Sequence, residues 1–185
     1  MDREKVSYTY DLIPWTFGEI GIVTYADRCS RIRRILLPEE GVSMADRIRQ
    51  EFRGALPATA AGEFPRLLST FLRGAEVDFS AVELDLDGMQ DFVRRTLIAC
   101  REIPRGRVVT YGGLATALGV HGGARAVGNA MAGNPFSLVI PCHRVIRSDG
   151  ALGGFGGGLP MKRALLEMEG VRFDSRGRVF SEYIL

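Results

Sequence analysis

Histidine, cysteine, lysine and long apolar runs are all scarce in this chain of 185 residues. The three cysteines are an odd number at irregular spacing, which argues against a disulfide framework and favours free thiols in a reducing compartment. No apolar run approaches the ~18 residues that cross a bilayer. The charged residues 1–5 lack the apolar core of a signal peptide. We therefore expect a cytoplasmic protein without a membrane partner.

The few possible metal ligands are also widely separated. The two histidines are His121 and His143, and residues 1–99 contain Cys29 but no histidine. A metal site in that part of the chain has little support, so we expect neither a metal nor another cofactor. Cys100 falls on the apolar side of an expected helix and is interpreted as an inert core residue.

Net charge is only +2, but the basic residues are unevenly distributed. Residues 101–150 contain six arginines and two acids, whereas residues 1–100 contain more acids than bases. This local excess indicates a polyanionic partner such as a nucleic acid, although an excess of this size also arises by chance.

Residues 1–86 predict a supporting domain with a sheet and two helices. Alternating apolar residues and turn signals delimit the elements. The expected strands are 6–12, 17–25 and 30–37, and the expected helices are 43–53 and 64–72. The last two strands should form an antiparallel hairpin across Asp27–Arg28, and Asp87-Gly88 is the expected domain boundary.

Residues 87–185 predict a mostly helical domain. Its expected helices are 89–102, 111–118, 124–132 and 160–169, with a short strand at 107–110. The Gly-containing turn at 119–123 gives the middle pair the spacing of a helix-turn-helix. The fold class is therefore α/β (α+β): an antiparallel three-stranded sheet with helices, followed by a winged-helix or helix-turn-helix domain.

The helix at 124–132 has one nearly smooth face. Packing is assigned to the side with Ala124, Val127, Gly128 and Met131, and the other side has Arg125, Ala126, Asn129 and Ala130. Most major-groove readers present several polar side chains, so one long cation on a smooth face suits the minor groove better. A plain helical hairpin with a surface arginine remains an equally open interpretation.

Cys142 and His143 form the most reactive pair in the sequence. A thiolate is a strong nucleophile and a nearby imidazole can serve as its base. Neighbouring residues in an extended chain point to opposite sides, so the two groups need a backbone turn or a bridging water. A Cys-His pair alone is more often structural.

Glu169 is a candidate third member of this site. It ends the last helix, where the helix dipole disfavours a carboxylate, and projects between Leu165 and Leu166. Such a carboxylate needs a partner. His143 would complete a Cys–His–Glu series, and an arginine is the rival partner.

Four motifs together resemble the O6-alkylguanine-DNA alkyltransferases, or methylated-DNA–protein-cysteine methyltransferases. The motifs are Ile140-Pro141-Cys142-His143-Arg144-Val145; Ala124-Arg125-Ala126-Val127-Gly128; Gly133-Asn134-Pro135; and Gly157-Gly158-Leu159 followed by Lys162, Leu165, Leu166, Glu169 and Gly170. The resemblance covers residues 84–173, while residues 1–83 match only in layout. It implies a ribonuclease H-like N-terminal domain.

The resemblance implies a suicide DNA repair protein, in which each molecule reacts once and is not regenerated. Cys142 would take the alkyl group from guanine O6, and O4-alkylthymine is a further expected substrate. His143 would take the thiol proton through a water, Glu169 would orient His143, and Tyr111 would protonate the leaving guanine at N3.

The resemblance also implies how DNA is bound. A monomer would hold duplex DNA containing O6-alkylguanine through the minor groove, and Arg125 would fill the gap left by the flipped base. Asn134 would brace the turn between this helix and the active site. The other expected contacts are Ala124, Ala126, Gly128, Asn129 and Ala130 on DNA, and Pro141, Val145, Phe155 and Gly156 at the base pocket.

Two pocket residues depart from the family pattern. Phe155 stands where tyrosine is common, and Gly156 where several members have serine, so alkyl preference stays open. The backbone at Cys142 and Val145 would accept from the guanine amino group.

Three alternative functions explain the sequence less completely than DNA repair does. A non-catalytic lesion-binding relative would lack the acceptor cysteine. A helix-turn-helix regulator leaves Cys142, His143 and Glu169 unexplained. A cysteine hydrolase does not need the smooth helix with Arg125.

Overall fold

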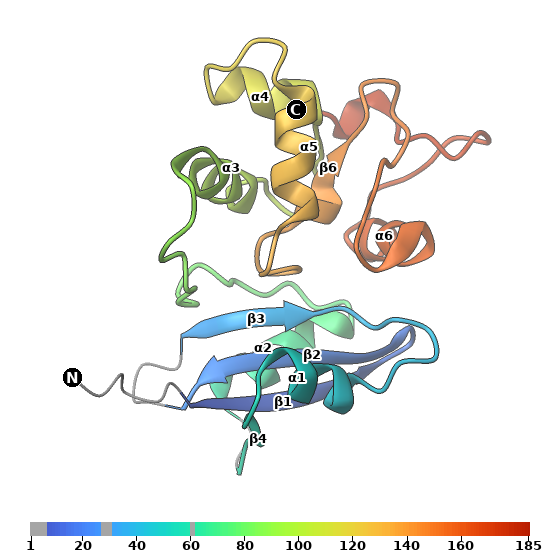
Figure 1. The fold of residues 1–185 in the computed structure, drawn as a ribbon. Coiled ribbons are helices and arrows are strands. Elements are labelled where there is room, and N and C mark those ends of the chain that lie inside the picture. The colour runs from blue at the N-terminus through green and yellow to red at the C-terminus, as the bar shows by residue number, and fades with distance from the viewer. Residues whose placement is uncertain (1–6, 27–30, 60–61) are drawn as a thin grey trace. The chain divides into compact units, whose positions relative to one another are not determined.

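The computed structural model describes residues 7–26, 31–59 and 62–185. Contacts divide the chain into two compact units, Met1–Asp85 and Leu86–Leu185, called here the N-terminal and C-terminal units (Figure 1). Cys29 and the expected hairpin turn at Asp27–Arg28 lie outside the described residues.

The N-terminal unit is built on a sheet in the order β3-β2-β1-β4. Its strands are β1 (Tyr8–Trp15), β2 (Gly18–Tyr25), β3 (Ile32–Leu36) and β4 (Leu56–Pro57). The first three are antiparallel as predicted, whereas β4 runs parallel to β1. The prediction of a three-stranded sheet is therefore corrected to four strands. Two exposed residues carry no alternating pattern, so β4 arises only from the backbone partner that β1 offers.

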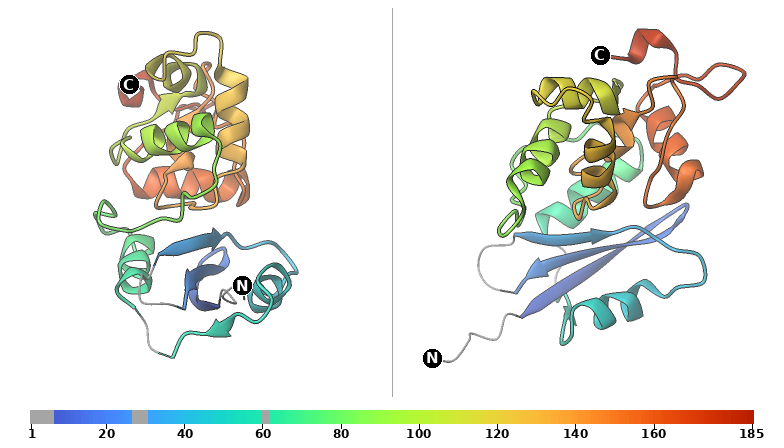
Figure 2. Two further views of the ribbon diagram at one scale, coloured as in Figure 1. Left: turned by 60° about the vertical axis from the view of Figure 1, so that its left-hand side comes forward. Right: turned by 45° about the horizontal axis from the view of Figure 1, so that its top comes forward.

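Two helices cover this sheet. Helix α1 (Met44–Glu51) packs against β2, and α2 (Glu63–Leu72) packs against β1 (Figure 2). Ser43 caps α1 by accepting from the Asp46 amide. Met44 and Ile48 approach β2 so closely that a Cβ at Gly21 would lie 2.8 Å from each of their side chains. The glycine therefore lets the helix lie against the strand.

The C-terminal unit is mainly helical. Its helices are α3 (Asp91–Arg101), α4 (Tyr111–Ala117), α5 (Ala124–Ala132) and α6 (Gly158–Met168), with short 3₁₀ turns at Cys142–Arg144 (η1) and Ser181–Tyr183 (η2). Helices α3, α4 and α5 pack against one another (Figure 2). A parallel pair of short strands, β5 (Val109–Thr110) and β6 (Val145–Ile146), joins the start of α4 to the end of η1.

The helix boundaries differ slightly from the predicted ones. Helix α3 begins at Asp91, two residues after the expected start. Helix α6 begins at Gly158, so Pro160 lies inside its first turn instead of starting it. Proline is tolerated there because the first amides of a helix have no intrahelical acceptor. Within the described residues, no helix has the length and apolar character to cross a membrane.

Candidate active site

Cys142 lies at the start of a 3₁₀ turn and not in an extended segment. Its amide donates to the Ile140 carbonyl at 2.8 Å, and the Arg144 amide donates to the Pro141 carbonyl at the same distance. The backbone therefore makes the turn that a joint role for Cys142 and His143 required. Both side chains are buried, with 7% of Cys142 and none of His143 exposed.

A strained segment leads into this turn. Leu138 has φ +77°, the one positive φ on a non-glycine residue in the described part of the chain, and it is buried. Such a conformation costs about 1–3 kcal/mol and persists only where the surrounding structure holds it. Asn134 provides the hold, because its amide nitrogen donates to the Ile140 carbonyl and its oxygen accepts from the Phe136 amide, both at 3.0 Å. Asn134 thus links the end of α5 to the chain entering Cys142.

His143 and Arg144 share one carboxylate. The Nε2 of His143 lies 2.9 Å from Glu169 Oε1. The Arg144 guanidinium donates to both carboxylate oxygens, through Nε at 2.9 Å and Nη2 at 2.8 Å. The Glu169 side chain is fully buried. Histidine and the rival arginine are therefore both partners of Glu169.

This pairing fixes the charge of the carboxylate. Burial opposes ionisation of Glu169, but His143 and Arg144 outweigh that effect and lower its pKa to about 2. Burial also lowers the pKa of His143, with Arg144 and Lys162 acting in the same direction and Glu169 against them. His143 Nδ1 is the one buried side-chain nitrogen or oxygen without a hydrogen-bond partner in the described chain.

The thiol of Cys142 is not an ionised group in this environment. Burial raises its pKa above the ordinary cysteine value, while hydrogen bonds from Asn134 and Ser137 and the charge of Lys162 oppose the increase. A buried thiol of this kind needs a base to become a thiolate. His143, one residue away and with a free ring nitrogen, is the base at hand.

Lys162 is a buried cation that holds two walls of the site together. Its side chain has no exposed surface, and Nζ donates to the Val145 carbonyl at 2.6 Å and to the Gly154 carbonyl at 3.2 Å. Burial lowers its pKa to about 8. The ammonium also lies 6.0 Å from the centre of the Tyr111 ring. Lys162 thus ties the strand after η1 to the glycine-rich segment before α6.

A cavity of about 300 Å³ opens beside Cys142. Six predicted site residues line it: Tyr111, Asn134, Cys142, Phe155, Gly156 and Gly128, the last of which was predicted as a DNA contact. The predicted pocket residues Pro141 and Val145 are buried and are not among the residues that line this cavity. Burial raises the pKa of Tyr111, so its hydroxyl keeps its proton at neutral pH and can donate it.

Fewer residues of α5 are exposed on the predicted DNA-facing side than the sequence suggested. Arg125, Ala126 and Asn129 are exposed, whereas Ala124 and Gly128 are half-buried. The placement of Ala130 on this side was wrong, because only 4% of it is exposed and it packs inward beside Val127. A helical wheel shows angles but not how far a neighbouring element reaches round the helix.

Sequence reasoning assigned no role to Arg144, Lys162 or Ser137. The burial of Lys162 could have been predicted from its position, three and four residues before Leu165 and Leu166 and therefore on the buried side of α6. A lysine at such a position must find acceptors inside the protein. Arg144 and Ser137 gave no comparable signal, because their partners come from other segments.

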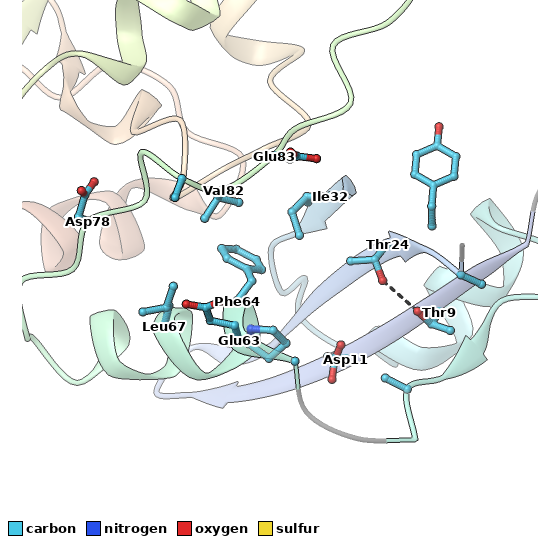
Figure 3. Close-up of a pocket in the computed structure, with 16 residues that line it drawn as sticks. Thr9, Asp11, Thr24, Ile32, Glu63, Phe64, Leu67, Asp78, Val82 and Glu83 are labelled. Carbon is cyan, nitrogen blue, oxygen red and sulfur yellow. Dashed lines mark hydrogen bonds between the residues drawn. The ribbon is translucent and has the colours of Figure 1, made fainter. Parts of the chain in front are cut away.

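The N-terminal unit contains a second and wider cavity, of about 530 Å³ (Figure 3). Thr9 and Thr24 hydrogen-bond to each other at 2.9 Å within it, and Asp11, Glu63 and Glu83 are among its acidic lining residues. The described residues that line it include no cysteine or histidine. Across the described residues, no group of three or more His, Cys, Asp or Glu side chains could hold a metal ion.

Comparisons with known proteins give a consistent result. Residues 91–171 match the family model described as the DNA binding domain of 6-O-methylguanine DNA methyltransferase. A methylated-DNA–protein-cysteine methyltransferase of Methanothermobacter thermautotrophicus is 40% identical over 141 residues, which are 75% of this chain and 79% of that protein. The Mycobacterium bovis protein of the same name is 47% identical over 55% of this chain and 61% of its own length.

Solved structures agree with the sequence relatives. The Mycobacterium tuberculosis OGT solved in complex with DNA is similar with a TM-score of 0.71 and 34% identity, over 89% of this chain and 92% of that one. The O6-methylguanine-DNA methyltransferase of Pyrococcus kodakaraensis gives a TM-score of 0.67 at 26% identity, over 89% of this chain and 99% of that one.

The chain therefore belongs to the O6-alkylguanine-DNA alkyltransferases, the methylated-DNA–protein-cysteine methyltransferases, which repair DNA by transferring an alkyl group to a cysteine. The family and the α/β fold class predicted from the sequence are confirmed. The relatives support alkyl transfer and not the alternatives of a non-catalytic lesion-binding protein or a regulator.

Proposed function

We propose that Cys142 is the residue that accepts the alkyl group, in a single irreversible transfer. The observation that carries this proposal is the position of Cys142 on the wall of the cavity, one residue from a histidine that is paired to a buried carboxylate. The thiolate sulfur attacks the alkyl carbon and the carbon–O6 bond breaks. The bonding electrons leave with the guanine, and the product on the protein is a thioether.

His143 and Glu169 prepare the nucleophile. Glu169 accepts a hydrogen bond from Nε2, which directs the lone pair of Nδ1 away from the carboxylate. Nδ1 is buried and without a partner, so it can take the Cys142 proton through one bridging water. Tyr111, which lines the cavity, supplies a proton to N3 of the departing guanine.

The cavity receives the flipped base. Phe155 offers a ring wall, and Gly156 offers a backbone amide to O6 without a side chain. The carbonyls of Cys142 and Val145 accept from the guanine amino group. The Val145 oxygen already accepts from Lys162 at 2.6 Å, but a carbonyl oxygen has two lone pairs and can serve both donors. O4-alkylthymine is the second expected substrate.

Helix α5 is the proposed minor-groove contact. Arg125, Ala126 and Asn129 are its exposed residues, and Arg125 is the one long cation among them. Small side chains allow the helix backbone to approach DNA, and Arg125 fills the gap in the base stack. Residues 87–185 would then hold both chemistry and DNA contacts in a monomer, with residues 1–86 in support. A reducing cytoplasm would keep Cys142 free.

The direct test is the mass of the protein after mixing with duplex DNA that contains O6-methylguanine. We expect one methyl group per protein, located on the tryptic peptide with Cys142, and no further turnover. Complete mixing that leaves the peptide unmodified would refute the assignment of Cys142.

Base flipping is tested separately with Arg125→Ala. We expect repair of duplex DNA to slow roughly 10–100-fold, because the flipped state loses about 1–3 kcal/mol, while transfer from free O6-benzylguanine changes less than about twofold. Lysine at position 125 is the matched variant, since it keeps the cation but not the planar guanidinium. Equal losses on both substrates would exclude the flipping role.

A further inference from the structure

Arg144 is placed to control the proton on His143. Its guanidinium makes a two-point contact with the carboxylate that His143 also uses, and its side chain is only 12% exposed. A third donor, Nη1, holds the Ile103 carbonyl, so the guanidinium is fixed from three sides. Arginine stays protonated in proteins, which makes this a permanent positive charge.

The charges around His143 favour a neutral imidazole. Glu169 supplies one negative charge, while Arg144 on η1 and Lys162 on α6 supply two positive ones. The other titratable groups of this cluster are Cys142, Cys100 and Tyr111, and their raised pKa values keep all three neutral. Protonating His143 would place a third buried cation beside one carboxylate, and Nδ1–H would have no acceptor among the described residues.

His143 can act as a base towards the Cys142 thiol only while its imidazole is neutral. An imidazolium has no lone pair to offer the Cys142 proton, whereas a neutral ring that donates from Nε2 to Glu169 has its lone pair on Nδ1. Without the arginine, only burial and the charge of Lys162 would oppose Glu169, and the imidazolium would form more readily. We propose that Arg144 is a positioning residue whose charge neutralises Glu169. His143 then stays unprotonated and can act as the base. This proposal rests on the proposed role of Cys142 as the alkyl acceptor.

The proposal is tested with Arg144→Gln and transfer from free O6-benzylguanine at two pH values. Removal of a nearby cation makes protonation of His143 easier, so the acid limb of the rate profile moves to higher pH. We expect the ratio of the rate near pH 6 to the rate near pH 8.5 to fall below that of the unaltered protein, by at most about tenfold for each unit by which the pKa of His143 rises. An unchanged ratio would overturn the proposal.

Two variants separate charge from packing. Arg144→Lys keeps the cation and loses the fork, so the ratio should stay within about twofold of the original if charge is what matters. Arg163→Gln is the control, since it removes an arginine of α6 that pairs with Glu167 at 2.8 Å on the solvent side. A purely structural role would make the lysine variant as impaired as the glutamine variant, at both pH values.

A measurement on the unaltered protein keeps the test independent of folding and of transfer. Nitrogen-15 NMR of the histidine rings at neutral pH should show His143 with its proton on Nε2 and a bare Nδ1, and substitution of His121 assigns the two signals. An imidazolium at that pH would sink the proposal even if Cys142 is alkylated. Failure of O6-benzylguanine to modify Cys142 would instead remove the proposed function and leave the NMR result standing.

Discussion

Two cavities of this protein, one in each unit, show that volume does not mark the cavity beside the proposed nucleophile. The cavity of the N-terminal unit is wider, at about 530 Å³, and several carboxylates line it. The cavity beside Cys142 in the C-terminal unit measures about 300 Å³ and has that cysteine on its wall. Among the described residues, the side chains of His143, Lys162 and Glu169 are fully buried, and all three belong to the unit that contains the cavity beside Cys142. Buried charges that perturb one another's pKa values indicate chemistry more reliably than volume.

Each unit has a buried carboxylate in a hydrogen-bonded network, Asp85 in the N-terminal unit and Glu169 in the C-terminal unit, and the two networks differ in whether a polar atom is left without a partner. In the N-terminal unit, Asp85 accepts from the Tyr25 hydroxyl at 2.5 Å and pairs with Arg31 and Arg33, and burial together with Asp85 raises the Tyr25 pKa to about 12. This network ties together strands. Glu169 is equally well paired, but its partner His143 retains one unsatisfied ring nitrogen. A hydrogen-bond network that includes an unpaired ring nitrogen can accept a proton, whereas a network whose polar groups are all paired stabilises the fold.

The largest expected effect is that of Cys142→Ala. Alkyl transfer should fall below detection because no other described cysteine lines the cavity, while binding to duplex DNA should persist. Mass spectrometry and a DNA-binding titration measure the two properties. Loss of binding together with transfer would make Cys142 a structural residue and remove the contrast between the cavities.

Glu169→Gln should damage both activity and stability. Glutamine keeps the size of the side chain but leaves Arg144 buried without its counter-charge, which costs about 3–5 kcal/mol of unfolding free energy. Transfer from O6-benzylguanine should slow roughly 10²–10⁴-fold because one neutral amide oxygen replaces the two carboxylate oxygens that hold His143 and Arg144. Urea unfolding and single-turnover kinetics give the two numbers. An intact rate in a folded variant would contradict the Cys–His–Glu series.

Acid should destabilise the C-terminal unit through the same residue. The folded-state pKa of Glu169 is about 2 against an ordinary value of 4.5, so its contribution is complete above pH 4.5 and is lost as pH falls towards 2. The loss amounts to about 3 kcal/mol. Glu169→Gln should abolish this part of the pH dependence, and Glu167→Gln, which removes an exposed acid of the same helix, should preserve it.

Asp11→Asn should have the smallest effect. Asp11 lines the N-terminal cavity, and burial raises its pKa, so its charge slightly opposes folding at neutral pH. The substitution should add less than about 1 kcal/mol to the unfolding free energy, because the group is largely solvated. Transfer should stay within about twofold of the original. A large change in rate would show that the two cavities are not functionally separate.

Much of this molecule is predictable from local pattern. Alternation placed β2, capping by Ser43 and the stop at Gly54 placed α1, and helical spacing placed Glu169 on the inner side of α6. Strand β4 and the burial of Ala130 escaped prediction, because each depends on what another segment places beside it. The first residues of α6 escaped for a different reason: Gly157 and Gly158 have no helical propensity to announce a helix.

The groups that could react, and the segments that carry them, follow from local sequence: a thiol beside an imidazole, and a carboxylate at the end of a helix where the dipole disfavours it. The tertiary structure decided their charges. His143, Arg144 and Glu169 come together over a separation of 26 residues, and Lys162 joins them from the buried side of α6. Proton affinity depends on burial and on neighbouring charges at distances of a few ångström, which no local pattern specifies.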